Sequence, residues 1–584
     1  MLIFFKYSCF NFIDHSLKEK DDITSSQSTV IPSQPSTGSN FSIKGGRDYV
    51  SKNLVGKIDV MTERVVAAID KCRITFRMAV HLISAIALAL GIDPKDLILN
   101  KSSFHVRIKS VRKKLAENIK ELYGEKSITS AIIHWDGKII PDSFSGKNID
   151  RLPILATVGK DEQLIDVAAL ENGKGITQAN AVFGALTDWG LRESIKALCC
   201  DTTNSNLGHI NGAATLLEQF LGRDLLYLPC RHHIYEIILA AAFDSKIPGT
   251  SGPNVPLFKR FRDNWNNIDQ SKFKNGLHLN NIDEILMNKI PGITAFIKKS
   301  LNSKWPRDDY RELLELSLIF LGGIPTKDVK FRKVGAIHHA RFMAKAIYSL
   351  KIYMFREVFK LTNTEKKALF DLCLFIVFVY IESWFKVPLA IKAPNQDLNF
   401  IKKLFEYKKV DSKLAIACLL KMKNHGWYLT AEASALALFD NDVSIEIKKK
   451  MVAATLNEDT NSSSKKKFHI KNLADMELLV NKNMDHFISS ESLKFFDRFE
   501  INSGFLKEGV ETWSKNNLYL QGSKIAADLQ VVNDVSERAV QLAERHVNRT
   551  TNEGQKKYLC QMISEYNKQF PNATKKTVTK KMKI

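Results

Sequence analysis

The chain has 584 residues, of which 45% are apolar, so it is long enough for several domains with sizeable cores. Lys and Arg outnumber Asp and Glu by 85 to 63, and the net charge of +22 favours a polyanion or an anionic membrane surface as partner. The eight cysteines form no CxxC pair and lack the dense spacing of a secreted disulfide framework, which favours the cytosol or the nucleus.

Residues 1–54 are predicted to lie outside any folded domain. Residues 23–48 are rich in Ser, Thr, Pro and Gly and too polar to bury a core, so they predict a disordered linker. The apolar residues before this linker are interrupted by polar ones, and no small-residue cleavage site follows them. We therefore do not expect a signal peptide.

Residues 55–126 predict a helical, basic domain. Apolar residues recur at intervals of three and four up to Gly91, and a second helix is expected at about 102–123. This second helix carries a basic cluster that can bind DNA phosphates, although a solvated helix face has the same composition. The cluster consists of Arg107, Lys109, Arg112, Lys113 and Lys114.

Residues 127–244 change to short β-rich runs separated by glycine and polar residues. Their order, three strands, helix, strand, helix, strand, helix, predicts an α/β fold with a mixed sheet and helices packed on it. Residues 127–240 hold 9 basic and 13 acidic residues, so the rest of the chain carries a net charge of +26. An acidic core in a basic chain suits a metal site with flanking polyanion-binding surfaces, and uneven surface charge without function gives the same pattern.

Residues 245–525 predict an all-helical insertion. Its most apolar stretch, LCLFIVFVYI at 372–381, has half the length needed to span a bilayer, so we expect a buried core helix. The hydrophilic residues 457–467 predict a loop. Two further helices are expected within 526–570, and the basic tail 571–584 is a weak signal for nuclear import or phosphate binding.

Two aspartates stand at predicted strand ends. Asp136 falls in the first strand, inside IIHWDGKII, and Asp201 ends the fourth, so neighbouring strands of this sheet can bring the two carboxylates together. Close carboxylates repel unless a cation joins them, and Mg²⁺ prefers a few carboxylate oxygens plus water. The pair predicts a divalent-metal site. The alternative is that Asp136 forms a turn with Gly137 and Asp201 caps the next helix.

An Asp at the first strand, an Asp after the fourth and a Cys-x-x-His after the fifth resemble the RNase H-like catalytic core of hAT superfamily cut-and-paste transposases. In that family CCDTTNSN stands where the second catalytic aspartate is found, and CRHH supplies the supporting pair Cys230 and His233. A large all-helical insertion then precedes the third carboxylate, which matches Glu537 between Ser536 and Arg538. The family's usual N-terminal BED zinc finger is absent, so the chain resembles a divergent, hAT-related lineage.

Each of these matches has an ordinary structural alternative. Glu537 lies three residues after Asp534, which is the spacing of a helix capping box. The Cys-x-x-His pair is half of a zinc site, but the sequence has no second pair nearby. HHARFMAKA is similar to the family's Arg-Trp motif, whose tryptophan stacks on a flipped base. Here Arg341 is followed by Phe342, which stacks with less surface or is a core aromatic.

The resemblance implies that Asp136, Asp201 and Glu537 hold two Mg²⁺ or Mn²⁺ ions for phosphodiester hydrolysis and strand transfer by a DDE mechanism. It also implies DNA as partner, both element ends and target, a nuclear location, self-assembly into oligomers and no membrane. The alternatives are a transposase-derived, catalytically inactive DNA-binding or chromatin-associated protein, and an RNase H-like nuclease acting on RNA or a hybrid. An unrelated α/β hydrolase is disfavoured because no GxSxG motif or Walker P-loop occurs.

Overall fold

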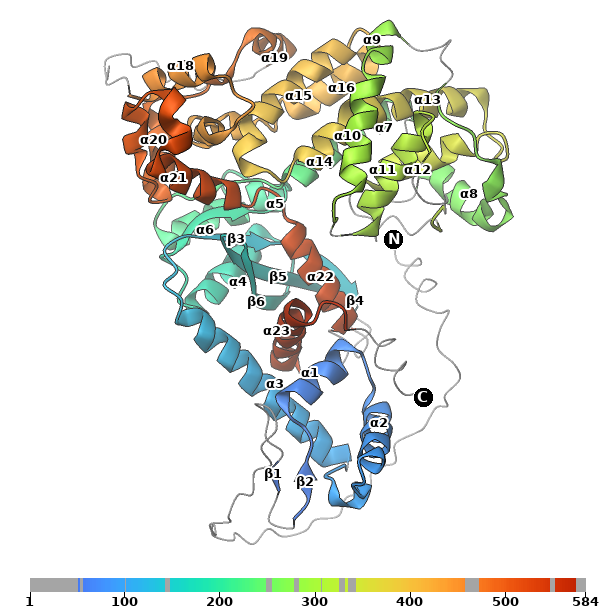
Figure 1. Cartoon of the computed structure of the whole chain (residues 1–584), viewed down its shortest axis with the longest axis vertical. Helices are drawn as coiled ribbons and strands as arrows, with labels where there is room; N and C mark the ends of the chain where they lie inside the picture. Colours follow the sequence, from blue (N-terminus) through green and yellow to red (C-terminus); the bar gives the residue numbers. More distant parts are fainter. Residues whose placement is uncertain are drawn as a thin grey trace.

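The protein is a mixed α/β structure, mostly helical, with one six-stranded mixed sheet in this computed structural model (Figure 1). The expected linker 23–48, the loop 457–467, the end of the basic tail, and Arg341 with Phe342 lie outside the described residues. The structure describes residues 51–52, 56–99, 101–141, 148–247, 255–277, 283–305, 307–324, 331–333, 343–456, 472–546 and 552–573.

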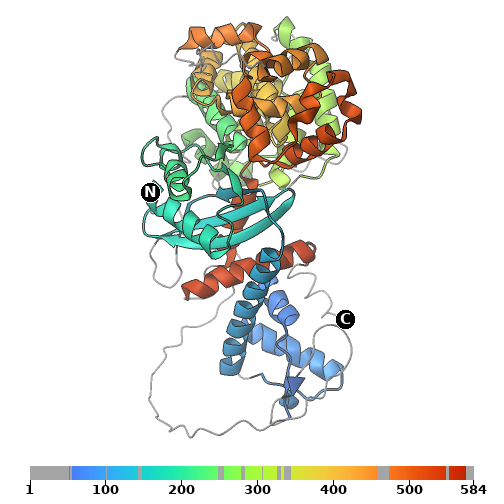
Figure 2. The ribbon, with the colours of Figure 1, turned by 90° about the vertical axis from the view of Figure 1, so that its left-hand side faces the viewer.

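The N-terminal part is helical, as expected, and lies at the opposite end of the molecule from the large helical lobe (Figures 1 and 2). The first predicted helix is divided in two, because Thr75 starts a new helix by accepting a hydrogen bond from the Met78 amide at 3.3 Å. Two short strands that the sequence did not predict, β1 and β2, pair antiparallel. The elements are β1 Ser51–Lys52, β2 Ile58–Asp59, α1 Glu63–Lys71, α2 Phe76–Ala89 and α3 Lys101–Gly124.

The sheet contains the five predicted strands, with the first one interrupted. β3 and β4 pair antiparallel with successive halves of β5, so they form one long strand that is broken at Asp136 and Gly137. β6 pairs with the other edge of β5, while β7 and β8 extend the sheet in parallel beyond β3. The strands are β3 Ala131–Trp135, β4 Lys138–Pro141, β5 Asn148–Val158, β6 Asp161–Leu170, β7 Ile195–Cys199 and β8 Leu226–Tyr227.

Helices cover both faces of the sheet, because side chains alternate between the faces along each strand. Ile154 and Ala156 of β5 pack in one core with α4 and α6, whereas Leu155 packs in the other with α22 and α23. The second core also contains α1 and α3, so it joins the N-terminal helices to the sheet. The covering helices are α4 Gly175–Asp188, α6 Ala213–Leu221, α22 Asp534–His546 and α23 Glu553–Gln569.

The helix expected at about 207–221 is two helices, α5 (Asn204–Leu207) and α6, joined by a tight turn. Gly212 is required in this turn, because a Cβ there would lie 2.5 Å from the backbone nitrogen of Gly208. The glycines that follow Asp201 in the sequence therefore serve a close backbone approach.

The insertion begins as α7 (Arg231–Lys246) leaves the sheet, and the described residues between 255 and 528 contain helices and no strand. The stretch 372–381 is buried throughout, which confirms the expected core helix. It belongs to Asn363–Lys386, a helical stretch long and apolar enough to cross a membrane but mostly buried against the protein. The lobe's helices are α8 Pro256–Asn264, α9 Glu284–Met287, α10 Ile290–Leu301, α11 Asp308–Phe320, α12 Ala344–Met354, α13 Asn363–Phe375, α14 Ile381–Lys386, α15 Ala393–Tyr407, α16 Ser412–Met422, α17 Ala431–Ser434, α18 Ile445–Leu456, α19 Leu473–Leu478, α20 Leu493–Arg498 and α21 Asn517–Asp528.

Candidate functional site

The two predicted aspartates follow neighbouring parallel strands in register. His134 of β3 lies opposite Cys199 of β7, and Asp136 and Asp201 come two residues later on their respective strands. Adjacent strands are about 5 Å apart, so both aspartates emerge at the same edge of the sheet. Asp136 lies in the break between β3 and β4 rather than within a strand, which corrects the expected position by one residue.

Asn206 connects the two strand ends. Its side-chain oxygen accepts a hydrogen bond from the indole Nε1 of Trp135 at 2.9 Å, and its Nδ2 donates to Oδ1 of Asp201 at 2.7 Å. The same Oδ1 accepts hydrogen bonds from the amide and the hydroxyl of Thr203, at 3.0 and 2.6 Å. Asp201 therefore fixes the turn before α5 through Thr203, which is the N-cap residue of that helix, so Asp201 is not the helix cap of the alternative interpretation.

Electrostatic effects agree with the proximity of the two aspartates. Burial raises the pKa of the Cys200 thiol well above its ordinary value, and the nearby carboxylates of Asp201 and Asp136 raise it further. Burial by itself would also raise the pKa of Asp201, but His233 and the hydrogen bonds of Thr203 outweigh it and lower that pKa. Asp201 is therefore held as a carboxylate, the form that binds cations.

The CRHH segment contacts a different part of the protein with each residue. The Cys230 amide donates to the carbonyl of Cys200 at 2.9 Å, which continues the pairing of β7 with β8. The Cys230 sulfur accepts a hydrogen bond from the amide of Asn533 at 3.2 Å, and Asn533 Nδ2 donates to the carbonyl of Trp135 at 2.9 Å. Cys230 thus brings the start of α22 to the strand end that carries Asp136, while His233 lies near Asp201.

Arg231 and His232 fix this edge of the sheet to the helical lobe. Arg231 is fully buried and donates to Oδ1 of Asp397 at 2.5 Å and to the carbonyl of Val387 at 2.7 Å. His232 stacks on Trp384 with ring centroids 4.1 Å apart, and its Nδ1 lies 2.9 Å from Oδ1 of Asp534.

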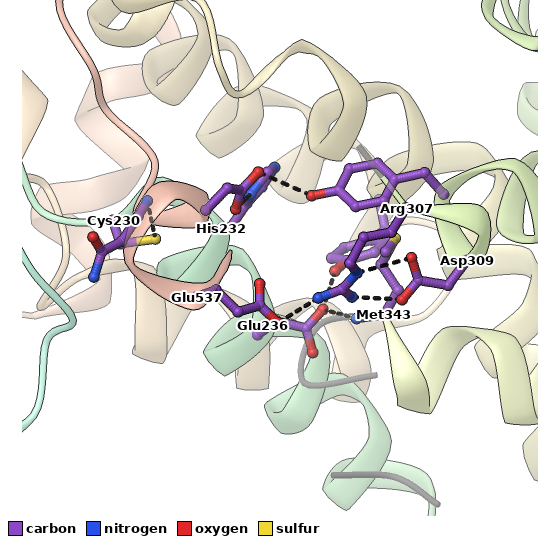
Figure 3. A network of polar contacts seen from close by, with 11 residues as sticks. Cys230, His232, Glu236, Arg307, Asp309, Met343 and Glu537 are labelled. Atoms are coloured by element: carbon purple, nitrogen blue, oxygen red, sulfur yellow. Dashed lines mark hydrogen bonds and ion pairs between the residues drawn. The ribbon is translucent and has the colours of Figure 1, made fainter. Parts of the chain in front are cut away.

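The sequence pointed to His233 but not to its neighbour His232, which is fully buried and belongs to the polar network in Figure 3. It also gave Asp534 only a capping role. The Asp534 carboxylate is engaged on both oxygens, since Tyr310 donates to its Oδ2 at 3.1 Å while His232 contacts Oδ1. Two features of the sequence could have indicated the contact between His232 and Asp534. These are the pair of adjacent histidines in CRHH and the aspartate at the start of the Ser-Glu-Arg helix.

The third predicted carboxylate, Glu537, points toward the helical lobe (Figure 3). It lies one turn into α22, where its Oε1 forms an ion pair with Nη1 of Arg307. Arg307 also binds the carboxylate of Asp309, through Nε at 3.1 Å. Glu537 therefore lies near the same end of α22 as Asn533, and its carboxylate is paired with Arg307.

The other residues of the Ser-Glu-Arg motif lie on different faces of α22. Ser536 is fully buried in the packing of this helix. Arg538 is exposed and binds the carboxylate of Glu162 at 2.5 Å. Ser536 is therefore a packing residue of α22, and Arg538 is paired with Glu162 rather than with Asp136 or Asp201.

The basic cluster of α3 is only partly available to a ligand. Arg112 is buried and binds both carboxylate oxygens of Asp70, at 2.9 and 2.7 Å, so it joins α3 to α1. This corrects its assignment as a DNA contact. Arg107 pairs with Asp59 at 2.8 Å, Lys113 lies 3.8 Å from Glu117, Lys109 is half-buried, and Lys114 is exposed.

Two of the three predicted metal ligands, Asp136 and Asp201, follow neighbouring strand ends. Asp136 and Asp201 lie side by side, and Asp201 is held ionised. Within the residues that the structure describes, however, no group of three or more His, Cys, Asp or Glu side chains gathers closely enough to hold a metal ion. The third predicted ligand, Glu537, forms an ion pair with Arg307.

Glu236, which belongs to the polar network in Figure 3, has a raised pKa. It lies one turn after His232 on α7 and accepts hydrogen bonds from the Tyr380 hydroxyl at 2.6 Å and the Met343 amide at 2.7 Å. Burial raises its pKa from 4.5 to about 7, although both hydrogen bonds oppose the shift. The folded protein therefore binds more protons than the unfolded chain between these pH values, and stability falls as pH rises through them.

Replacing Glu236 with glutamine should remove this pH dependence, because the amide oxygen can still accept both hydrogen bonds. We expect the melting temperature of Glu236→Gln to rise relative to wild type between pH 5 and pH 8, corresponding to about 2 kcal/mol. Glu382→Gln is the matched control: burial would raise the Glu382 pKa, but Lys403 and Lys386 hold it at about 2. Its difference from wild type should stay constant over this range, and a constant difference for Glu236→Gln would contradict the assignment.

Comparison of the sequence with models of known protein families gives no match, and comparison with curated proteins gives none either.

Proposed function

We propose that this protein is a transposase-like enzyme that binds DNA and cleaves phosphodiester bonds with the help of Mg²⁺ or Mn²⁺. The observation that carries the proposal is the pair Asp136 and Asp201, which follow neighbouring parallel strands in register at one edge of the sheet. Two close carboxylates repel each other, and a divalent ion between them would relieve this repulsion and suit phosphoryl chemistry.

The arrangement of the core supports an RNase H-like fold of the divergent hAT-related kind. Counting the interrupted strand as one, Asp136 belongs to the first strand, Asp201 follows the fourth, and CRHH follows the fifth. The helical lobe then separates these motifs from α22, which returns to the sheet beside β5 and carries Glu537. This is the order of elements that the resemblance requires.

The protein's own residues prepare the site in three ways. Thr203 and Asn206 orient the Asp201 carboxylate through its Oδ1, and His233 keeps it ionised. Asp136 and Asp201 would hold a metal ion, which when bound supplies activation of water or a 3′-hydroxyl and stabilises the leaving oxygen. Glu537, whose Oε1 is paired with Arg307, would be the third ligand. DNA, a nuclear location and self-assembly belong to the same proposal.

The test is nicking of supercoiled plasmid DNA by the purified full chain. We expect slow conversion to the nicked form with Mn²⁺ or Mg²⁺, and none with EDTA. An RNA strand and an RNA–DNA hybrid of the same sequence should be cut more slowly than DNA. If DNA is bound but stays intact in every divalent metal, the enzymatic proposal is wrong.

A second candidate, a transposase-derived protein that binds DNA without cutting it, is favoured by one observation. Arg307 neutralises Glu537, and the same guanidinium also binds Asp309, so three side chains hold the ion pair. In this candidate the pair is a permanent structural element, whereas in the enzyme it opens when metal and DNA bind.

Replacing Arg307 with alanine separates the two candidates. Both carboxylates lose their counter-ion, so we expect the variant to be less stable than wild type by about 2 kcal/mol without metal. If Glu537 is a metal ligand, Mn²⁺ should raise the melting temperature of Arg307→Ala more than that of wild type, with about tenfold tighter binding. Arg307→Lys, which keeps the charge, is the control. An equal response of Arg307→Ala and wild type to Mn²⁺ would exclude Glu537 as a ligand.

A further inference from the structure

A basic cleft lies where the end of α1 meets α22 and α23. In Figure 1, α1 and α23 lie on the side of the sheet away from the helical lobe. Its volume is about 550 Å³. Among the described residues that line it there is no Asp or Glu, while four are basic: Lys71, Arg73, Arg538 and Arg545. The N-terminal helices and the C-terminal helices both contribute, so the cleft forms only in the folded chain.

Two exposed arginines that line the cleft, Arg73 and Arg545, are not neutralised within it. Among the described residues, no carboxylate forms an ion pair with Arg73 or with Arg545. Burial lowers the pKa of Arg73, and the positive charge of Arg545 lowers it further, so the two guanidinium groups are close enough to repel each other. Like charges held together in this way are stabilised by an anion between them.

The backbone at Arg73 turns the chain out of α1. Arg73 has a φ of 55°, in the left-handed region that residues other than glycine seldom adopt. This is the turn that ends α1, in which the amides of Arg73 and Ile74 donate to the carbonyls of Asp70 and Ile69, at 3.2 and 2.9 Å. Here the left-handed turn after α1 brings Arg73 to the wall of the cleft.

The cleft is aligned with the candidate site by α22. Glu537 lies at the start of this helix, and Arg538 and Arg545 follow on it, two turns apart. Seven residues of α-helix span roughly 10 Å, which is about three nucleotide steps along one DNA strand. Because Arg538 directly follows Glu537, α22 connects the cleft to the third residue that the resemblance assigns to the site.

We propose that this basic cleft binds phosphates of the DNA backbone and holds the strand that enters the candidate site. Arg538 is held by Glu162, which leaves Lys71, Arg73 and Arg545 for a ligand. An extended polyanion can contact these three side chains together, whereas one small anion neutralises only one or two of them. The choice of DNA as the polyanion rests on the proposed function. The binding of backbone phosphates does not require that the protein cleave them.

The experiment measures binding of the full chain to a fluorescein-labelled 30-base-pair DNA duplex by anisotropy, between 50 and 200 mM KCl. The double variant Arg73→Gln/Arg545→Gln should bind about tenfold more weakly at 100 mM KCl. The slope of log Kd against log salt concentration should fall by about one to two, because one counterion is released per phosphate contact. Arg73→Lys/Arg545→Lys, which keeps both charges, should retain most of the slope.

The matched control is Arg192→Gln, an exposed arginine before β7, at the opposite end of that strand from Asp201. It should bind DNA as wild type does. Wild-type affinity and slope in Arg73→Gln/Arg545→Gln would overturn the cleft assignment, and so would an equal loss in Arg192→Gln. If the glutamine variant unfolds, the comparison passes to the single variants Arg73→Gln and Arg545→Gln, each expected to lower the slope by about one.

This outcome is distinguishable from that of the proposed function. If the cleft variants lose affinity while wild type nicks no DNA, the cleft proposal is supported and the enzymatic proposal is wrong. If wild type nicks DNA while the cleft variants bind it normally, the reverse holds.

Discussion

Asp201→Asn and Asp136→Asn should each reduce the rate of Mn²⁺-dependent DNA nicking by about 100-fold or more. Asparagine keeps the shape of aspartate, so Oδ1 of residue 201 can still accept the hydrogen bonds of Thr203 and Asn206. What is lost is the negative charge that holds the metal ion. A bound ion contributes several kcal/mol to stabilising the transition state, and each 1.36 kcal/mol is a factor of ten in rate.

Asp269→Asn is the control for this prediction, because Asp269 has the same local hydrogen bonding. Its Oδ1 accepts from the amide and the hydroxyl of Ser271 at 3.0 and 2.6 Å, as Asp201 accepts from Thr203. It lies in the helical lobe and is exposed, so nicking should be unchanged. DNA binding in EDTA should be at wild-type strength in all three variants. Wild-type nicking by Asp201→Asn would show that the paired aspartates are structural.

Arg231→Met should destabilise the junction between the sheet and the helical lobe by about 3 to 5 kcal/mol. Arg231 and Asp397 are both buried, and methionine leaves the Asp397 carboxylate without its counter-ion. The carbonyl groups of Val387 and Ala393 lose a donor as well. Since Arg231 follows Cys230, opening at this point should also loosen the contact of CRHH with the start of α22.

Native-state hydrogen exchange is the suitable measurement, because a chain of several domains does not unfold in one step. Amides of α7 and α15 should exchange faster in Arg231→Met, while those of α1 and α3 should be unaffected. The double variant Arg231→Met/Asp397→Leu removes both charges and should recover most of the loss. Unchanged exchange in Arg231→Met, or no recovery in the double variant, would contradict the buried-pair account.

The strands and most helices of the core follow from local patterns. Short β-rich runs marked the strands, and three- and four-residue periodicity marked the helical segment that ends at Gly91. The sequence did not predict that two of the expected helices are each divided in two. Both divisions depend on details of a turn, since Thr75 caps α2 and Gly212 allows a close approach of two backbones between α5 and α6. The positions of Asp136 and Asp201 were predictable because strand order alone sets which strand ends meet.

The sequence by itself thus determined an α/β core with a helical insertion, and two aspartates at one edge of the sheet. Only the tertiary structure decided which charged side chains are paired within the protein and which remain available to a ligand. Glu537 meets Arg307 across 230 positions, His232 meets Asp534 across 302, and Arg112 is used by Asp70 rather than by a ligand. The physical reason is that a long charged side chain has no periodic signal in the sequence. Its partner is chosen by the packing of elements that are remote along the chain.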